Sequence, residues 1–204
     1  MIAIIDYGIG NLASVFNMLQ RIGVDCCVTN KQSQIKNASH LILPGNGSFD
    51  ACMRGLKETG LIHFLEELVL KDKVPILGIC VGAQILGHCS TEGNERGLGW
   101  LNFKVERIPT LPGLRIPHMG WNHVNVAQVG HTLINDVTAS TRFYFVHSYY
   151  MKPQDPKDIL LHSNYGGDFA AAVARKNIAG VQFHPEKSHT FGKRLLSAFA
   201  SWSP

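Results

Sequence analysis

One cysteine in this chain lies where the sequence could place a catalytic nucleophile. Cys80 follows the apolar run 74–79 and lies between Gly78 and Gly82, which predicts a strand, a sharp turn and then a helix. A side chain at such a turn is presented to substrate, and the N-terminal end of a helix favours its thiolate form. The backbone N–H of Val81 is then placed to stabilise an oxyanion. The alternative is a buried cysteine at a strand end, which would be preferred without the two glycines.

A base and an acid that could orient it lie far downstream. His184-Pro185-Glu186 ends the apolar run 178–183, and the proline stiffens the chain directly after the histidine. His184 can act as the base and Glu186 can orient it, which is a catalytic triad with cysteine in place of serine. A lone histidine at a strand end is more often structural, so this prediction depends on the pairing with Cys80.

Two glycine-containing turns follow strands in the first half of the chain. Pro44-Gly45-Asn46-Gly47 would be an ordinary turn on its own, but loops at the carboxyl ends of parallel strands lie where ligands bind. Its N–H groups could therefore face a substrate carbonyl beside the cysteine. Residues 8–13 match a dinucleotide fingerprint, yet the acid that this motif requires is missing from the end of the second strand. We expect no cofactor.

Composition is that of an ordinary folded protein. The 204 residues are 45% hydrophobic and 17% charged, which favours a single domain over residues 1–204. The net charge of +4 includes no Lys/Arg run, so nucleic-acid binding is not expected. No apolar run could span a bilayer, no signal peptide is evident, and the five cysteines lack zinc-ligand spacing. We expect a cytoplasmic protein with reduced thiols and no membrane or metal partner.

The elements that must position these groups change in character along the chain. Up to residue 79, short apolar runs alternate with helical periodicity, which predicts a parallel sheet with helices on both faces. Later strands are separated by turn residues, and a helix is expected over 188–202. The expected later strands are 100–108, 123–126, 142–149, 159–162, 169–174 and 178–183. We therefore predict an α/β fold: an open, mostly parallel sheet flanked by helices, with an antiparallel β-rich extension.

These residues together resemble the class I, triad-type glutamine amidotransferases. Members of that class carry Gly-x-Cys-x-Gly-x-Gln around the nucleophile and His-Pro-Glu for the rest of the triad, as this chain does up to Gln84 and at 184–186. Within the class, further segments resemble the glutaminase subunits of imidazole glycerol phosphate synthase. Those segments are 6–11, the Pro44 turn, 117–122 and 143–149. The resemblance covers essentially the whole chain and implies the flavodoxin-like fold of the class.

The resemblance implies hydrolysis of L-glutamine to glutamate and ammonia. The Cys80 thiolate would attack the side-chain amide, His184 would protonate the leaving ammonia, and water would hydrolyse the thioester. The implied oxyanion positions are Val81, Gly45, Asn46 and Gly47. The implied substrate-binding positions are Gln84, Glu92, Ser148 and Tyr149, where the carboxylate suits an ammonium group.

The resemblance also implies a heterodimer. In this family ammonia passes through a channel to a (β/α)₈-barrel cyclase subunit, which makes imidazole glycerol phosphate for histidine biosynthesis and an aminoimidazole carboxamide ribonucleotide. The implied interface positions are Asn11, Trp121, Tyr144, His147 and Lys187. Contact with a partner would give the 8–13 turn a role other than nucleotide binding.

One residue departs from the family pattern. The position inside Pro-Gly-x-Gly is usually aliphatic, and here it is Asn46. In the family this turn is thought to keep the enzyme inactive until a peptide reorients. Asparagine tolerates left-handed backbone geometry better than a β-branched residue does, so we expect more glutaminase activity without the synthase ligand.

Three other functions are compatible with the same residues. A paralogous glutaminase could supply ammonia to a sugar-modifying amidotransferase in surface-polysaccharide synthesis, and segment 188–192 is compatible with such a variant. A non-catalytic binding subunit could have kept the fold, although the intact triad opposes this. A cysteine peptidase is the third, although Gln84 and Glu92 suit a free amino acid better.

Overall fold

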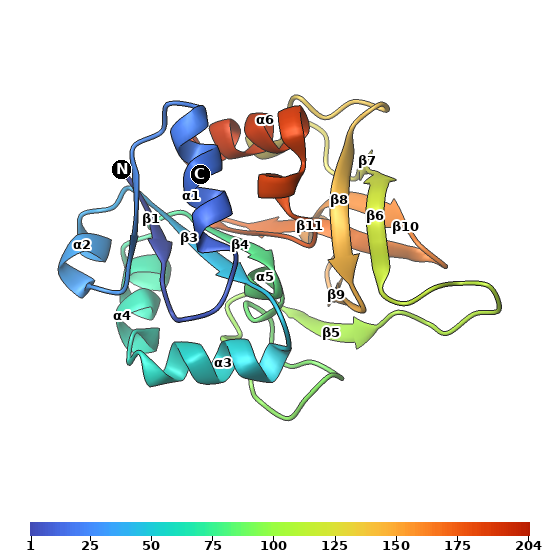
Figure 1. The fold of residues 1–204 in the computed structure, drawn as a ribbon, viewed down its shortest axis with the longest axis horizontal. Helices are drawn as coiled ribbons and strands as arrows, with labels where there is room; N and C mark the ends of the chain where they lie inside the picture. The colour runs from blue at the N-terminus through green and yellow to red at the C-terminus, as the bar shows by residue number, and fades with distance from the viewer.

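The first half of the chain forms a parallel sheet, as seen in the computed structural model, which describes residues 1–204 (Figure 1). Four strands lie in the order β2-β1-β3-β4 with parallel pairing throughout. Strands β1 and β4 are buried along their whole length, which explains why they are continuous apolar runs in the sequence. The bounds are β1 (Ile2–Ile5), β2 (Cys26–Thr29), β3 (His40–Gly45) and β4 (Ile76–Cys80).

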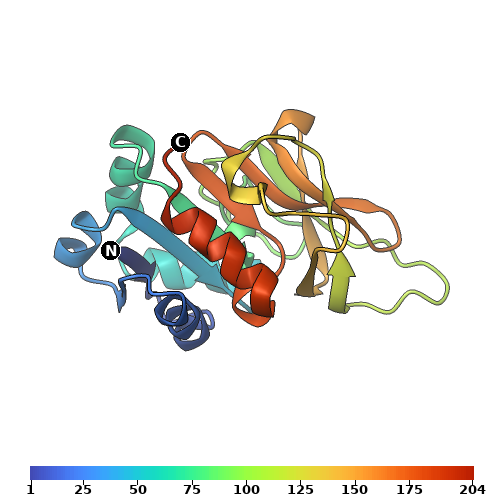
Figure 2. The same cartoon turned by 90° about the horizontal axis from the view of Figure 1, so that it is seen from above.

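Helices cover both faces of this sheet. Helices α1 (Leu12–Arg21) and α6 (His189–Ala200) pack against each other on one side, and α3 (Phe49–Glu58) and α4 (Ile62–Glu66) lie on the other (Figures 1 and 2). A short helix, α2 (Gln32–Lys36), follows β2, and α4 continues into a π-helical turn, Glu67–Lys71. None of these helices combines the length and apolar character that a membrane crossing requires.

The second half extends the sheet with antiparallel strands. Strand β12 is parallel to β4, and β11, β10 and β7 follow it outward with antiparallel pairing. Strand β9 pairs with both β5 and β11, while β6 and β8 form a separate two-stranded sheet (Figure 1). The bounds are β5 (Phe103–Arg107), β6 (His118–His123), β7 (Asn125–Val126), β8 (Arg142–His147), β9 (Tyr149–Pro153), β10 (Ile159–Asn164), β11 (Asp168–Arg175) and β12 (Ile178–Val181).

The predicted fold class is confirmed, and three details of the prediction are wrong. The expected strand 142–149 is two strands, because the chain breaks at Ser148 and passes from the small sheet to the large one. Helix α3 was missed although Phe49, Cys52, Met53 and Leu56 recur at helical spacing on its buried face. Strand β6 was missed because its sequence, HMGWNH, has few of the β-branched residues that mark a strand.

The hydrophobic core crosses both halves. One cluster of 55 buried residues runs from β1 to Trp202, beyond the end of α6. The carboxyl-terminal edge of the parallel strands lies at Cys80, because Ile79 of β4 pairs with Val181 of β12 and Gly45 of β3 pairs with Cys80. Three neighbouring strands therefore end together at Cys80.

Candidate functional site

The backbone at Cys80 is strained, and its neighbours hold it there. Cys80 ends β4 with φ 55° and ψ −116°, a conformation that residues other than glycine rarely adopt. A Cβ atom at Gly82 would lie 1.9 Å from the Leu43 carbonyl oxygen, and one at Gly78 would lie 2.5 Å from Ala83 Cα. Gly82 is thus required for the turn to pack against β3, and Gly78 is required for the residues after Cys80 to pack against β4, as the sequence suggested for a tight turn.

The helix after Cys80 is shorter than expected. Helix α5 comprises only Val81–Gln84, a single turn, so it lacks the aligned peptides that would give a full macrodipole. The contribution of this helix to the site is therefore limited to its first backbone N–H group. Val81 is the first helical residue, its N–H has no acceptor within the helix, and the residue lines the cavity beside the thiol.

His184 and Glu186 form a buried pair. Nδ1 of His184 lies 2.8 Å from Oε1 of Glu186, and the carboxylate can only accept, so Nδ1 carries the proton. Pro185 between them begins a 3₁₀ turn, which brings the carboxylate back under the ring. The other ring nitrogen, Nε2, is buried without a hydrogen-bond partner. This nitrogen is the one available to exchange a proton with Cys80.

The electrostatics of this pair favour the imidazolium. Burial lowers the pKa of His184, but the hydrogen bond to Glu186 and the negative charge on Cys80 and Glu186 more than offset this effect and raise the pKa to about 10. A histidine that holds a proton beside a thiol is the arrangement found in Cys–His nucleophiles. The Cys80 thiol itself is within 3.9 Å of the Val146 carbonyl oxygen.

A cavity of about 580 Å³ opens at Cys80. Its size is in the range of small-molecule sites. Twelve of the residues singled out from the sequence line it: Asn11, Asn46, Gly47, Cys80, Val81, Gln84, Glu92, His147, Ser148, Tyr149, His184 and Lys187. Glu186 lies behind His184, whereas Gly45, Trp121 and Tyr144 do not line the cavity.

Gly45 has a packing role that differs from the expected oxyanion role. It belongs to β3, where it pairs with Cys80, and a Cβ atom there would lie 2.2 Å from the Gly82 nitrogen. Within the turn Pro44-Gly45-Asn46-Gly47, only Asn46 and Gly47 line the cavity. Asn46 does not adopt a positive φ, whereas Gly47 does, at 76°.

Two side chains donate hydrogen bonds to the carbonyl groups of this turn, and neither was singled out from the sequence for this role. The Tyr7 hydroxyl donates to the Pro44 carbonyl, and the Cys52 thiol lies 3.3 Å from the Asn46 carbonyl oxygen. Burial raises the pKa of Cys52 to about 11 and that of Tyr7 well above its usual value, so both groups stay protonated donors.

Gln84 and Glu92 each leave one oxygen for a ligand. The Gln84 amide nitrogen donates to the Tyr149 carbonyl at 2.9 Å and to Oε1 of Gln182 at 3.0 Å. Oε2 of Glu92 accepts the backbone N–H of Phe49 at 2.7 Å, at the start of α3. Gln182 was not singled out from the sequence, although an amide inside the apolar run 178–183 was a usable signal.

Three of the expected interface residues form an exposed patch with two others, which we call the aromatic patch. Trp121 is 40% exposed and stacks on His189 at 5.5 Å, with the Arg142 guanidinium 5.6 Å from its ring centroid. The Lys187 ammonium lies 5.9 Å from the centroid of Tyr144. His147, by contrast, is only 6% exposed and lines the cavity at Cys80, so it is not part of this patch.

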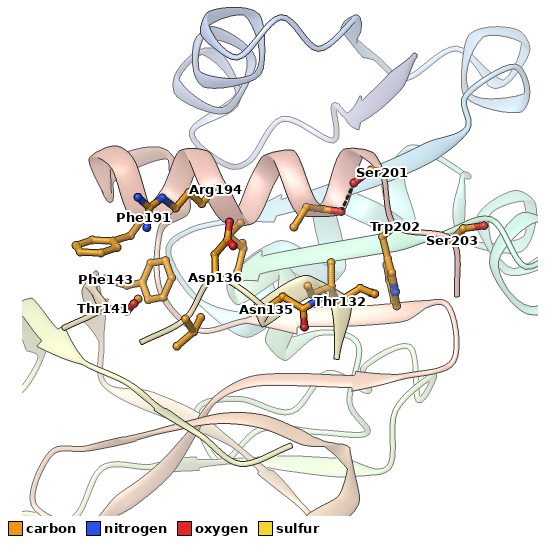
Figure 3. A pocket seen from close by; sticks show the side chains of 14 residues that line it. Thr132, Asn135, Asp136, Thr141, Phe143, Phe191, Arg194, Ser201, Trp202 and Ser203 are labelled. Carbon is orange, nitrogen blue, oxygen red and sulfur yellow. Dashed lines mark hydrogen bonds between the residues drawn. The ribbon is translucent and has the colours of Figure 1, made fainter. Parts of the chain in front are cut away.

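A second cavity lies away from these groups. It has a volume of about 390 Å³ and opens between α6 and residues 132–137 (Figure 3). Asp136 and Arg194 border it, together with Phe143 and Trp202, but no cysteine or histidine lines it. Of these two cavities, only the one at Cys80 is lined by both a cysteine and a histidine.

Comparison with known proteins agrees with this geometry. The family model "Glutamine amidotransferase class-I" matches residues 3–201. Relatives named imidazole glycerol phosphate synthase subunit HisH 2, from Pseudomonas aeruginosa and Methanococcus maripaludis, are 50% and 48% identical to this chain, each over 98% of both chains.

Solved structures agree in fold. A structure described as a glutamine amidotransferase matches with a TM-score of 0.75 at 21% identity, over 97% of this chain and 96% of that one. PurLQS from Thermotoga maritima gives a TM-score of 0.76 at 17% identity with the same coverage. Because the family model spans nearly the whole length and the relatives match end to end, the chain is an enzyme of the class I glutamine amidotransferase family, among the subunits named HisH.

Proposed function

We propose that this chain hydrolyses L-glutamine through a thioester on Cys80. The observation that carries the proposal is the buried His184–Glu186 pair, whose free Nε2 belongs to the cavity that Cys80 opens. Nothing else in the cavity combines a nucleophile with an oriented base.

The proposed reaction has two steps that share one proton carrier. His184 takes the thiol proton, and the thiolate adds to the side-chain amide carbon of glutamine. The oxyanion accepts hydrogen bonds from backbone N–H groups at Val81 and at the Asn46-Gly47 turn. His184 then gives the proton to the leaving nitrogen, ammonia departs, and a thioester remains. Water gives a proton to His184 and attacks the thioester, and the thiol regains its proton as glutamate leaves.

The free oxygens in the cavity support an amino acid as substrate. The unpaired carboxylate oxygen of Glu92 suits the α-ammonium group, and Oε1 of Gln84 can accept a second hydrogen bond from it. Ser148 and Tyr149 line the same cavity.

We further propose that the ammonia goes to a (β/α)₈-barrel cyclase subunit in a cytoplasmic heterodimer of histidine biosynthesis. The names of the relatives support this, since each is a subunit of imidazole glycerol phosphate synthase. The aromatic patch supplies an exposed surface for that partner, and Lys187 belongs both to this patch and to the lining of the cavity. Asn11 also lines the cavity.

A second candidate is a paralogous glutaminase that feeds a sugar-modifying enzyme. One observation supports it: in segment 188–192, His189 stacks on Trp121 and has a left-handed backbone, φ 46°. Growth without histidine after deletion of the gene separates the two. Loss of growth supports the synthase, and normal growth supports the paralogue.

The proposed nucleophile is tested by labelling with an electrophilic L-glutamine analogue, followed by peptide mass spectrometry. We expect stoichiometric modification of Cys80 with the L-enantiomer and none with the D-enantiomer. The four other cysteines, Cys26, Cys27, Cys52 and Cys89, are internal controls. Equal labelling of all cysteines, or no labelling of Cys80, would contradict the proposal.

A further inference from the structure

Two buried histidines connect the small β6-β8 sheet to the wall of the cavity at Cys80. His118 on β6 and His147 on β8 face each other, with Nδ1 of His118 3.0 Å from Nε2 of His147. Nδ1 of His147 lies 2.9 Å from the Tyr149 carbonyl oxygen. At the other end, Nε2 of His118 lies 3.2 Å from the amide nitrogen of Asn122.

The acceptor at one end fixes the direction of every bond. A carbonyl oxygen can only accept, so Nδ1 of His147 carries a hydrogen and its Nε2 is the acceptor. Nδ1 of His118 must then donate to it, which leaves Nε2 of His118 to accept from the Asn122 amide. That amide nitrogen also donates to the Asn164 carbonyl at 2.9 Å, so it is correctly oriented as the nitrogen.

The surroundings keep both rings neutral. His118 is stacked between Phe145 and Tyr165, with ring centroids 4.9 and 4.0 Å away. Neither histidine is paired with a carboxylate, and burial lowers the pKa of His118 to about 4 and that of His147 to about 3. The charged neighbour of His147 is His184, which acts in the same direction.

The chain of hydrogen bonds ends at Gln84, which the proposed function assigns to substrate binding. The Tyr149 carbonyl accepts from His147 and also from the Gln84 amide, whose second N–H donates to Gln182. This carbonyl therefore fixes which way the Gln84 amide is turned. If the amide rotated, a nitrogen instead of an oxygen would face the ammonium group of glutamine.

We propose that His118 and His147 are positioning residues, which hold the Tyr149 carbonyl and thereby keep Oε1 of Gln84 turned toward the substrate. The inference rests on the proposed function for the identity of the substrate. It also accounts for the burial of two histidines that neither the triad nor the aromatic patch uses.

Matched substitutions at His147 separate its two nitrogens. In His147→Asn the side-chain N–H takes the place of Nδ1–H and can still donate to Tyr149, whereas His147→Gln places its amide where Nε2 was and loses that donor. We expect His147→Gln to raise KM for glutamine about tenfold with kcat changed less than about threefold. His147→Asn should keep KM within about threefold of the natural chain. Equal KM values for the two variants would overturn the proposal.

A spectroscopic measurement tests the arrangement without any activity. In the ¹⁵N-histidine-labelled full chain, long-range ¹H–¹⁵N spectra report the tautomer of each ring, and His118→Asn and His147→Asn assign the two sets of signals. We expect both histidines to be neutral, with hydrogen on Nδ1, down to pH 5. Hydrogen on Nε2 of either ring, or protonation above pH 6, would overturn the hydrogen-bond chain. Because these spectra need no turnover, failure here is distinguishable from failure of the proposed glutaminase activity.

Discussion

Cys80 adopts a backbone conformation that a cysteine ordinarily avoids, and this makes its thiol available. Conformations of this kind cost on the order of 1–3 kcal/mol and persist only where the surroundings enforce them. Here β3 and β12 pair with β4 on both sides, and glycine contacts remove any room for relaxation. The backbone conformation of Cys80 is therefore enforced by the surrounding sheet and not by the intrinsic preference of a cysteine.

Glu186 should matter chiefly for the rate of the chemical step. Glu186→Gln keeps the size of the side chain but removes the charge that stabilises the imidazolium of His184, so we expect kcat for glutamine hydrolysis to fall roughly 100-fold. Steady-state kinetics in the complex would show it. As a matched control, Glu92→Gln should raise KM with little change in kcat. A fall in kcat for Glu92→Gln together with a raised KM for Glu186→Gln would contradict the roles proposed for the two carboxylates.

The proton on His184 should also contribute to stability in a defined pH range. Its pKa is raised from 6.5 to about 10 on folding, so the contribution is complete below pH 6.5 and is lost as the pH rises toward 10. Each unit of pKa difference is worth roughly 1.4 kcal/mol. Urea denaturation at pH 6, 8 and 10 should show the free energy of unfolding falling more for the natural chain than for His184→Gln. Parallel losses would contradict the raised pKa.

At the scale of elements, the break between β8 and β9 shapes the cavity. Strand β8 belongs to the small sheet and β9 to the large one, and Ser148 lies between them. The chain must turn there, and Ser148 and Tyr149 at the turn line the cavity, as Glu92 does. A continuous strand over 142–149 would have carried these residues past the cavity.

The turn at Asn46 is the element whose conformation should control resting activity. The carbonyl groups of Pro44 and Asn46 accept hydrogen bonds from Tyr7 and Cys52, and these two bonds restrain the backbone of the turn. A β-branched residue at position 46 tolerates fewer backbone conformations than asparagine does. We expect Asn46→Val to lower glutamate release several-fold in the complex without the nucleotide ligand. Equal basal rates for the two chains would refute this.

Sequence alone singled out Cys80, His184 and Glu186 because each of them lies in a local pattern. Glycines flank Cys80, and proline joins His184 to Glu186. It could not show from the residues themselves that β12 lies beside β4, since such pairing depends on the packing of the whole sheet. The resemblance to a known family supplied that step. The burial of His147 was hidden for a related reason, because alternation along β8 does not reveal which face meets the core.

For the whole molecule, the aromatic patch should carry much of the affinity for the partner subunit. Half-exposed tryptophans at interfaces often contribute about 2 kcal/mol or more, so Trp121→Ala should weaken binding of the barrel subunit roughly 30-fold. Titration calorimetry measures the change. Val28→Ala, on the edge strand β2 of the large sheet, removes an exposed apolar side chain outside the patch and should leave the affinity unchanged. Similar effects from both substitutions would place the interface elsewhere.

The most direct test of the whole account is glutamate release from L-glutamine in the complex with the barrel subunit, before and after its nucleotide substrate is added. The Cys80→Ala chain serves as the blank. We expect measurable release that depends on Cys80 and is strongly stimulated by the nucleotide. Release that persists in Cys80→Ala would contradict the proposed nucleophile, and release that ignores the nucleotide would contradict the assignment to histidine biosynthesis.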